Sequence, residues 1–403
     1  MMVVFSGGGT AGHFYPALNL AEALARLRPG VRPYFVGTEG RIEARELPRT
    51  GYEYRLLPVS GLTSPLGALR RPGGGIPDRL TRLLAASVAN VRAIWRLLVA
   101  VATLAPTLRR RQAAAVVVTG GYASAPAGIV GRLLGIPVVV QEQNAHPGKT
   151  TRLISRWARQ VHLAHPGAAA ALPPSARPRV LHTGNPIRPL PSGGDLDREA
   201  ARRALGAPTS GRLLLIVGGS LGADAINRPT IEILSGGLLS EREFVLWATG
   251  RAHFDLVEAA LAGVERDRFR VVPYLEPEAM YRALAAADLA VSRAGAMATS
   301  EFLAFGLPAV LMPLPTAAGD HQRANTRSLE AAGAAVLLPE RDETGAQVGG
   351  ERLWRELRRI LETPGLLDRM GAAARRIARP DAAIDIAAAI ATLLSVPQAE
   401  AGP

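Results

Sequence analysis

The feature that most constrains the fold is a glycine-rich turn that directly follows a short apolar run, because the chain contains it twice. The first copy, VVFSGGGTAG, covers residues 3–12, and the second, LLIVGGSLGA, covers residues 214–223. Each turn is followed by a helical pattern, which is typical of a parallel strand leading into a covering helix. Two copies favour an α/β protein of two doubly wound, Rossmann-like halves over one large sheet.

Further apolar runs of this kind alternate with helical patterns along the chain. The 403 residues are 48% hydrophobic and 20% charged, so the chain is globular and long enough for two cores. A cluster of prolines and glycines at residues 182–195 marks the boundary between the halves. The apolar helix expected over Ala382–Leu394 could belong to either half. We expect strands over Met2–Phe5, Pro33–Val36, Ala115–Val118, Pro137–Val140, Leu213–Val217, Phe244–Trp247, Phe269–Val272, Leu289–Ser292 and Ala309–Met312.

The composition restricts the chemistry. The chain has no cysteine, which excludes disulfides, thiol nucleophiles and cysteine-ligated metals. The formal net charge is +13 and Lys149 is the only lysine, so the positive charge is almost entirely arginine. Such a surface attracts nucleic acid, anionic lipid or phosphorylated substrates, and the lack of a basic motif interleaved with aromatic residues ranks nucleic acid last. The chain enters a strand at once, so we expect no signal peptide and a cytoplasmic location.

The segment 76–111 mixes arginine with leucine, valine, isoleucine and Trp95 and ends in three consecutive arginines. Its longest uncharged run, Leu97–Leu108, has 12 residues, which are too few to span a bilayer. Two interpretations stay open. The segment could be a core helix with a solvated basic face, or an interfacial helix whose apolar side enters lipid while its arginines meet headgroups.

The first glycine turn spells G-x-G-x-x-G over residues 7–12, the fingerprint of a dinucleotide-binding turn. A dehydrogenase of this fold has an acidic residue about 20 residues further on, at the end of the second strand. Glu39 comes 27 residues after Gly12 and beyond another glycine, which weakens the dinucleotide interpretation. His13 follows the last glycine, where it could act as a base on a molecule bound at the loop or bond to a loop carbonyl.

The second half offers three candidate ligand-binding features. Gly218–Ser220 precede a helix and suit a diphosphate, although a tight turn alone explains one of the glycines. Glu301 lies about one turn into a helix that follows another glycine loop, where its carboxylate could accept both hydroxyls of a ribose or simply favour the helix start. Gln322, in the segment AGDHQRAN at 318–325, suits sugar hydroxyls or helix-cap packing.

Other motifs point to chemistry only weakly. His162 and His165 have no third ligand near them in the sequence, so we expect no metal site. Asp195 and Asp197 form a D-x-D pair that resembles a metal-nucleotide motif, but REAARRAL follows, which favours helix capping. The chain has no G-x-S-x-G and no Walker lysine after a glycine loop, which argues against hydrolase and P-loop chemistry.

Taken together and in order, the motifs resemble those of the MurG family. The resemblance runs from residue 2 to about residue 340 through GGTAGHFYPAL, VVTGGYASAPAGIVGRLLGIPVVVQEQNAHPG, GNPIR, GGSLGADAIN, YLEPEAMYRALAAADLAVSRAGAMATSE and PLPTAAGDHQRAN. It implies a GT-B fold, in which two Rossmann-like domains face a central cleft. The acceptor and membrane-binding domain would comprise residues 1–183 plus 378–396, and the UDP-GlcNAc-binding domain residues 184–377.

The resemblance also implies an activity. It is the inverting, metal-independent transfer of GlcNAc from UDP-GlcNAc to the 4-hydroxyl of MurNAc-pentapeptide on undecaprenyl diphosphate, which converts lipid I to lipid II in peptidoglycan synthesis. No cofactor and no nucleic acid are implied. The implied partner besides the substrates is an anionic membrane surface. The protein would be peripheral at the cytoplasmic face of the plasma membrane, and segment 76–111 would contact the lipid.

The same resemblance assigns roles residue by residue. His13 would be the general base, Glu301 would hold the ribose, and Gln322 would contact the GlcNAc hydroxyls. The acceptor diphosphate would lie in a cradle of Gly8, Gly9, Thr10, Gly120, Gly121 and Tyr122. The donor site would comprise Thr10, Gly12, Asn144, Arg188, Gly219, Ser220, Met280, Glu301 and Gln322.

Three positions depart from the family pattern. Gln141 stands where histidine is usual before EQN, Thr151 where asparagine is usual, and Leu221 where glutamine is usual. These changes bear on donor specificity more than on the fold. The main alternative is a GT-B glycosyltransferase that uses another UDP-sugar or lipid acceptor. A further alternative is a membrane-associated scaffold that binds UDP-sugar. Another is an NAD-dependent oxidoreductase.

Overall fold

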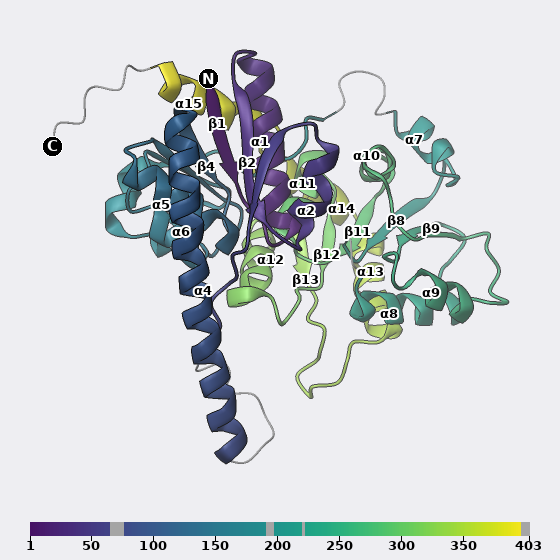
Figure 1. Ribbon diagram of the computed structural model, residues 1–403. Coiled ribbons are helices and arrows are strands. Elements are labelled where there is room, and N and C mark those ends of the chain that lie inside the picture. The colour runs from purple at the N-terminus through teal and green to yellow at the C-terminus, as the bar shows by residue number, and fades with distance from the viewer. Residues whose placement is uncertain (65–75, 191–196, 220–221, 396–403) are drawn as a thin grey trace. The chain divides into compact units, whose positions relative to one another are not determined.

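The computed structural model describes residues 1–64, 76–190, 197–219 and 222–395, and these form two compact units. The first unit comprises residues 1–143, 147–188 and the segment from Asp381 onward. The second unit comprises residues 144–146 and 189–380. Each unit is built on a parallel sheet (Figure 1), and each is described by itself below.

The first unit contains a seven-stranded sheet with the order β3-β2-β1-β4-β5-β6-β7, in which every pair is parallel. The strands are β1 (Met2–Ser6), β2 (Arg32–Thr38), β3 (Glu53–Leu57), β4 (Ala113–Val118), β5 (Val138–Glu142), β6 (Gln160–Leu163) and β7 (Val180–His182). Its helices are α1 (Ala11–Leu27), α2 (Ile42–Glu46), α4 (Ile76–Arg110), α5 (Ala125–Leu133), α6 (Lys149–Ile154) and α15 (Ala382–Ser395), with short 3-10 helices η1 (Leu47–Arg49), η2 (Tyr122–Ser124), η3 (Pro166–Ala171) and η4 (Pro174–Arg179).

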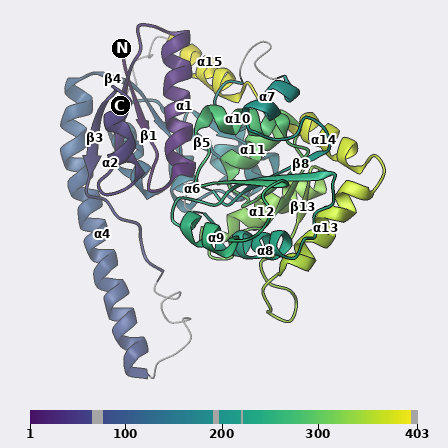
Figure 2. The ribbon, with the colours of Figure 1, turned by 90° about the vertical axis from the view of Figure 1, so that its right-hand side faces the viewer.

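Alternate residues of the inner strands pack against different helices, as the two-residue period of a strand requires. Val3 and Phe5 of β1 are buried with α1 and α15, whereas Met2 and Val4 are buried with the last turns of α4 and with α5. Figure 2 shows α1 and α4 on opposite sides of these strands. Both faces of the sheet are therefore covered, which is why the inner strands read as continuous apolar runs.

The last helix, α15, is part of the first unit. It packs along α1, and Ile386 and Ile390 are fully buried in that contact. Gln160 donates to the carbonyl of Ala389 at 3.1 Å, and Arg28 donates to the carbonyl of Ala391 at 3.2 Å. The C-terminal apolar helix, which the sequence pattern left open and the family resemblance placed with the first domain, thus covers the face of the sheet formed by Val3 and Phe5.

The second unit contains a six-stranded parallel sheet with the order β10-β9-β8-β11-β12-β13. Leu213 and Leu215 of β8 belong to one core, and Leu214 and Ile216 belong to the core on the other face. The strands are β8 (Arg212–Val217), β9 (Glu243–Ala248), β10 (Phe269–Val272), β11 (Leu289–Ser292), β12 (Ala309–Leu311) and β13 (Ala335–Leu337). The helices are α7 (Arg198–Ala204), α8 (Asp224–Ser235), α9 (Phe254–Ala260), α10 (Pro277–Ala286), α11 (Ala296–Phe305), α12 (His321–Ala331), α13 (Gly350–Glu362) and α14 (Leu366–Ile377), with a 3-10 turn η6 (Ala318–Asp320).

The predicted α/β class with two parallel-sheet, Rossmann-like units is confirmed. The predicted helix cap near the boundary between the units is confirmed as well. Asp197 caps α7, and its carboxylate accepts the amide of Glu199 at 3.1 Å, as helix capping predicts. Asp195 lies outside the described residues.

We expect Ile390→Ala to lower the free energy of unfolding by about 2–5 kcal/mol, because it leaves a cavity between α15 and α1. Ile384, on the same helix, is 50% exposed and provides the matched control; Ile384→Ala should change stability by about 0.5 kcal/mol or less. Urea denaturation of both variants measures the difference. Equal effects of the two substitutions would show that α15 is not docked in this way.

Candidate active site

The two loops that follow β1 and β4 meet at the carboxyl edge of the first sheet. These strands are neighbours, and the chain leaves them toward opposite sides, so this is the topological switch point where doubly wound folds bind ligands. Gly8 and Gly121 pack closely, because a Cβ on Gly121 would lie 2.4 Å from the carbonyl oxygen of Gly8. A Cβ on Gly9 would lie 3.1 Å from the ring of Tyr122. The structure thus brings together the residues predicted to form the acceptor cradle.

His13 lies in the first turn of α1, after Thr10 and Gly12, and its ring packs against the second of these loops. A Cβ on Gly120 would lie 3.0 Å from its Nδ1 atom. Nδ1 is 3.1 Å from the carbonyl oxygen of Thr119 and 2.8 Å from Oε1 of Gln143. Since both of these oxygens accept hydrogen bonds, Nδ1 carries the proton in the neutral ring, and the basic nitrogen is Nε2.

A residue that the sequence did not single out, Glu43, lies beneath the first loop. Its side chain is fully buried, and Oε1 accepts the amides of Gly9 at 2.9 Å and of Thr38 at 3.2 Å. A Cβ on Gly8 would overlap with this carboxylate. The amide of Gly9 therefore already has an acceptor within the chain. Glu39, the acidic residue considered for a dinucleotide ribose, is exposed in the turn after β2.

The candidate donor residues of the second unit follow strands at the carboxyl edge of its sheet. Gly219 is the second residue after β8 and has a φ of +86°, a conformation that favours glycine. Glu301 lies on α11, after β11, and is half-buried. Gln322 lies on α12, after β12, and its Oε1 accepts the amide of Leu314 at 2.9 Å. Ser220 and Leu221 lie outside the described residues.

The remaining candidates are placed as follows. Met280, on α10, is half-buried and packs against the core of the second unit. Asn144 belongs to the second unit, where its Oδ1 accepts a bond from Asn325 of α12 at 3.2 Å. Arg188 is the last residue of its segment in the first unit, and its guanidinium lies 6.0 Å from the ring centre of Tyr15.

Two histidines of the first unit, the buried His162 and the half-buried His165, have lowered pKa values and are neutral at pH 7. Burial lowers the pKa of His162 to about 4. Burial also lowers the pKa of His165 to about 4, against the opposing charge of Glu142. Among the described residues, no three histidine, aspartate or glutamate side chains are grouped so that they could hold a metal ion.

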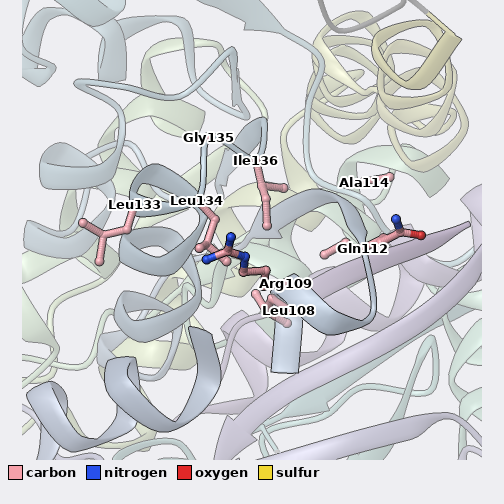
Figure 3. A pocket seen from close by; sticks show the side chains of 9 residues that line it. Leu108, Arg109, Gln112, Ala114, Leu133, Leu134, Gly135 and Ile136 are labelled. Atoms are coloured by element: carbon pink, nitrogen blue, oxygen red, sulfur yellow. The ribbon is translucent and has the colours of Figure 1, made fainter. Parts of the chain in front are cut away.

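A hollow of about 640 Å³ lies at the amino edge of the first sheet, opposite the carboxyl edge that carries the glycine loops (Figure 3). It is lined by the end of α4, the start of β4 and the residues between them, and by the end of α5 and the residues that follow it, among them Arg109, Gln112 and Leu133. Because these residues precede β4 and β5, the hollow faces away from the two glycine loops. It is therefore separate from the candidate active site.

We expect Gly121→Ala to destabilise the first unit more than Gly135→Ala. Both glycines have a positive φ, +73° and +69°, which costs an alanine about 1–2 kcal/mol in the left-handed helical region. Gly121 also has a ψ of 163°, a combination that is essentially restricted to glycine and costs about 1–3 kcal/mol. Only at Gly121 would the new Cβ meet backbone, the carbonyl of Gly8 at 2.4 Å, whereas nothing lies within 4 Å at Gly135. The overlap adds about 1–3 kcal/mol. Urea denaturation of the two variants checks the difference, and equal losses would contradict the packing of the two loops.

Comparisons with known proteins agree with this architecture. Residues 3–163 match the glycosyltransferase family 28 N-terminal domain, and residues 213–384 match the glycosyltransferase family 28 C-terminal domain. The chain is 40% identical to a protein of Salinibacter ruber over 96% of this chain and 95% of that protein. It is 37% identical to a protein of Chlorobium luteolum over 98% and 99%. Both are named UDP-N-acetylglucosamine--N-acetylmuramyl-(pentapeptide) pyrophosphoryl-undecaprenol N-acetylglucosamine transferase.

Solved structures give the same result. The crystal structure of Acinetobacter baumannii MurG aligns with a TM-score of 0.69 at 27% identity, covering 97% of this chain and 99% of that one. The UDP-GlcNAc 2-epimerase of Neisseria meningitidis, at 13% identity and a TM-score of 0.59 over 97% and 99%, shares the fold alone. The chain therefore has the GT-B fold and belongs to glycosyltransferase family 28, within the MurG family of UDP-GlcNAc-dependent N-acetylglucosaminyltransferases.

Proposed function

We propose that this chain transfers GlcNAc from UDP-GlcNAc to the 4-hydroxyl of MurNAc-pentapeptide on undecaprenyl diphosphate, with inversion and without a metal, and that His13 is the general base. The observation that carries the proposal is the placement of His13 at the switch point of a family 28 chain, with Nδ1 bonded to two acceptors. That bonding leaves Nε2 as the nitrogen that takes a proton from the attacking hydroxyl.

The acceptor diphosphate is proposed to lie at the loops after β1 and β4. Glycine at residues 8, 9, 120 and 121 lets the backbone of each loop approach a phosphate closely, and the start of α1 adds its amides and helix dipole. Glu43 already accepts the amide of Gly9, so the phosphates are assigned to the outer part of the turn, toward Thr10 and Gly12. With the phosphates there, the muramic acid hydroxyl is proposed to lie toward His13.

The donor is proposed to bind at the carboxyl edge of the second sheet. Glu301 would accept the ribose hydroxyls, Gln322 would donate its amide to the GlcNAc hydroxyls, and the loop at Gly219 would receive the diphosphate. Fixed amide donors and a guanidinium such as that of Arg188 stabilise the negative charge that grows on the departing UDP, which is the task that a metal performs in other transferases.

We expect His13→Ala to lower kcat by about 10²–10⁴-fold, because the proton of the attacking hydroxyl loses its acceptor. The affinity for UDP-GlcNAc should stay within about twofold of the original, since His13 serves the acceptor side. His182 is exposed at the end of β7, so His182→Ala is the matched control and should leave kcat unchanged. Unchanged turnover by His13→Ala would remove His13 from the mechanism.

The proposed membrane contact is the exposed apolar stripe of α4, formed by Leu80, Leu84, Val88, Val91, Trp95 and Leu98. These residues recur at intervals of three or four and so share one side of the helix. Val91 and Trp95 are 68% and 66% exposed. A helix side of this size and apolarity on a protein surface marks a contact with lipid or another protein.

An anionic bilayer is the occupant that the charge favours. Arg92 and Arg96 are exposed beside the stripe, and Arg109 and Arg110 are exposed at the end of the helix, while Asp78 is the only acidic residue within it. Lipid tails would receive the apolar side while the arginines meet anionic headgroups. Such a contact would hold the enzyme peripherally at the cytoplasmic face of the plasma membrane, where its lipid-linked acceptor lies.

Among the described residues, one helix, Asp78–Arg110, is long and apolar enough to cross a membrane by length and composition. We propose that it lies in the interface instead. Leu104 and Leu108 in its last turns are fully buried in the core of the first unit, and Arg92 and Arg96 add exposed charges beside its apolar stripe. We therefore propose the interfacial interpretation for the first part of the helix, and the burial of Leu104 and Leu108 supports the core interpretation for its end.

We expect the double variant Val91→Asp/Trp95→Asp to bind phosphatidylglycerol vesicles at least about tenfold more weakly, because each apolar side chain contributes about 1.5–3 kcal/mol when it enters lipid. Turnover of a water-soluble, short-chain acceptor should remain. Leu256, which is 72% exposed on α9, provides the control substitution Leu256→Asp. Vesicle sedimentation measures binding, and unchanged binding by the double variant would exclude this stripe as the membrane contact.

A further inference from the structure

A chain of buried carboxamide side chains runs away from His13 into the first unit. Its members are Gln143, Gln141 and Asn185, which are 1%, 0% and 3% exposed. Oε1 of Gln143 faces Nδ1 of His13 at 2.8 Å. Nε2 of Gln143 donates to Oε1 of Gln141, and Nε2 of Gln141 donates to Oδ1 of Asn185 at 3.1 Å. Buried polar groups of this number are costly unless they are bonded to one another.

Main-chain carbonyls fix the direction of every link. Nε2 of Gln143 also donates to the carbonyl of Thr119 at 2.8 Å, and Nδ2 of Asn185 donates to the carbonyl of Gln143 at 3.2 Å. Nε2 of Gln141 lies 3.4 Å from the carbonyl of Gly184. A carbonyl oxygen only accepts, so each nitrogen is identified by its partner and the amides cannot be turned around. The oxygen of Gln143 must therefore face His13.

We propose that Gln143 is the positioning residue of His13, and that Gln141 and Asn185 hold Gln143 in this orientation. This inference rests on the proposed role of His13 as the base. A neutral imidazole has one N–H, and an acceptor fixed at Nδ1 keeps that proton there and keeps Nε2 unprotonated. Gln143 performs with a neutral amide the orienting task that a carboxylate performs in a Ser-His-Asp triad, without adding a negative charge beside an anionic acceptor.

At its end away from His13, the carboxamide chain reaches a second segment of the first unit that is assigned a role. Asn185 belongs to the segment Gly184–Arg188, and Arg188 is proposed to bind the donor diphosphate. Asn19 of α1 donates to the carbonyl of Pro186 in the same segment at 2.7 Å. The base on α1 and the arginine segment are thus held in one hydrogen-bonded framework within the first unit.

The variants for the test are Gln143→Met and Gln141→Met, which keep side-chain length and remove the amide. Asn227 provides the matched control, because it is a buried amide that bonds to Thr249 and Trp247 within the second unit, whereas His13 and the carboxamide chain belong to the first. The readout is the ¹⁵N spectrum of protein labelled at its seven histidines, with the His13 signals identified by their loss in His13→Gln. A tautomer change at His13 is a signature that general destabilisation would not produce.

In the original chain, the neutral ring of His13 should show a protonated Nδ1 and an unprotonated Nε2. Gln143→Met should raise the share of the other tautomer and lower kcat about tenfold, the loss of about one hydrogen bond, with the KM for UDP-GlcNAc within about twofold. Gln141→Met should shift the tautomer in the same direction by a smaller amount, and Asn227→Leu should leave it unchanged. Gln141→Met contacts neither His13 nor the glycine loops, so it tests the proposal even where Gln143→Met does not fold.

Two outcomes would overturn the inference: an unchanged His13 tautomer in both methionine variants, or an equal shift in Asn227→Leu. Failure of the underlying function is distinguishable from these outcomes. If His13→Ala retains full turnover, His13 is not the base, yet the tautomer readout still reports whether Gln143 orients the ring. If His13→Ala loses turnover but the His13 tautomer is unchanged in Gln143→Met and Gln141→Met, His13 remains the proposed base and Gln143 is not its positioning residue.

Discussion

The parallel pairing of β1 with β4 is the constraint on which the rest of the first unit depends. Val3 to Ser6 of β1 run beside Ala115 to Val118 of β4 in register, so both strands end at the same level. Their following loops therefore meet, and glycine at the contact lets backbone approach backbone where a Cβ would collide. His13 and Thr119 are brought within hydrogen-bond distance by this pairing although 106 positions separate them in sequence. The apolar core on both faces of the two strands supplies the energy that holds this geometry.

The two units share one architecture but present different side chains at its carboxyl edge. In each, a parallel sheet delivers loops and helix starts to its carboxyl edge, which is a general property of doubly wound folds. In the first unit that edge holds an imidazole and two glycine loops, which suit a phosphate and a proton transfer. In the second unit it holds a carboxylate, an amide and a glycine turn, which suit a nucleotide sugar. Function is thus set by which side chains follow the strands, and the fold supplies their positions.

The sequence predicts the inner strands because they are buried on both faces and read as unbroken apolar runs. It does not predict β3, β7 or β13, and it indicates β6 only as a strand at or beside His162. These are short strands toward the edges of their sheets, and β3 is half exposed with the sequence EYRLL, so their apolar signal is weak. The switch-point glycines and His13 are predictable from local motifs. The burial of Glu43 beneath Gly9, and the bonds of Gln141 and Gln143, depend on contacts between distant segments that no local pattern records. Gln141 stands out in the sequence as a departure from the family, but only the structure shows its two partners.

The measurement that tests the account most directly is UDP release by the purified protein with UDP-GlcNAc, with and without a short-chain analogue of lipid I. The account predicts release that depends on the acceptor, together with a product heavier by one GlcNAc and β-linked to muramic acid. Donor binding without acceptor-dependent release would contradict the proposed acceptor and direct attention to another glycolipid. Absence of donor binding would contradict the assignment of the second sheet's carboxyl edge as the nucleotide-sugar site.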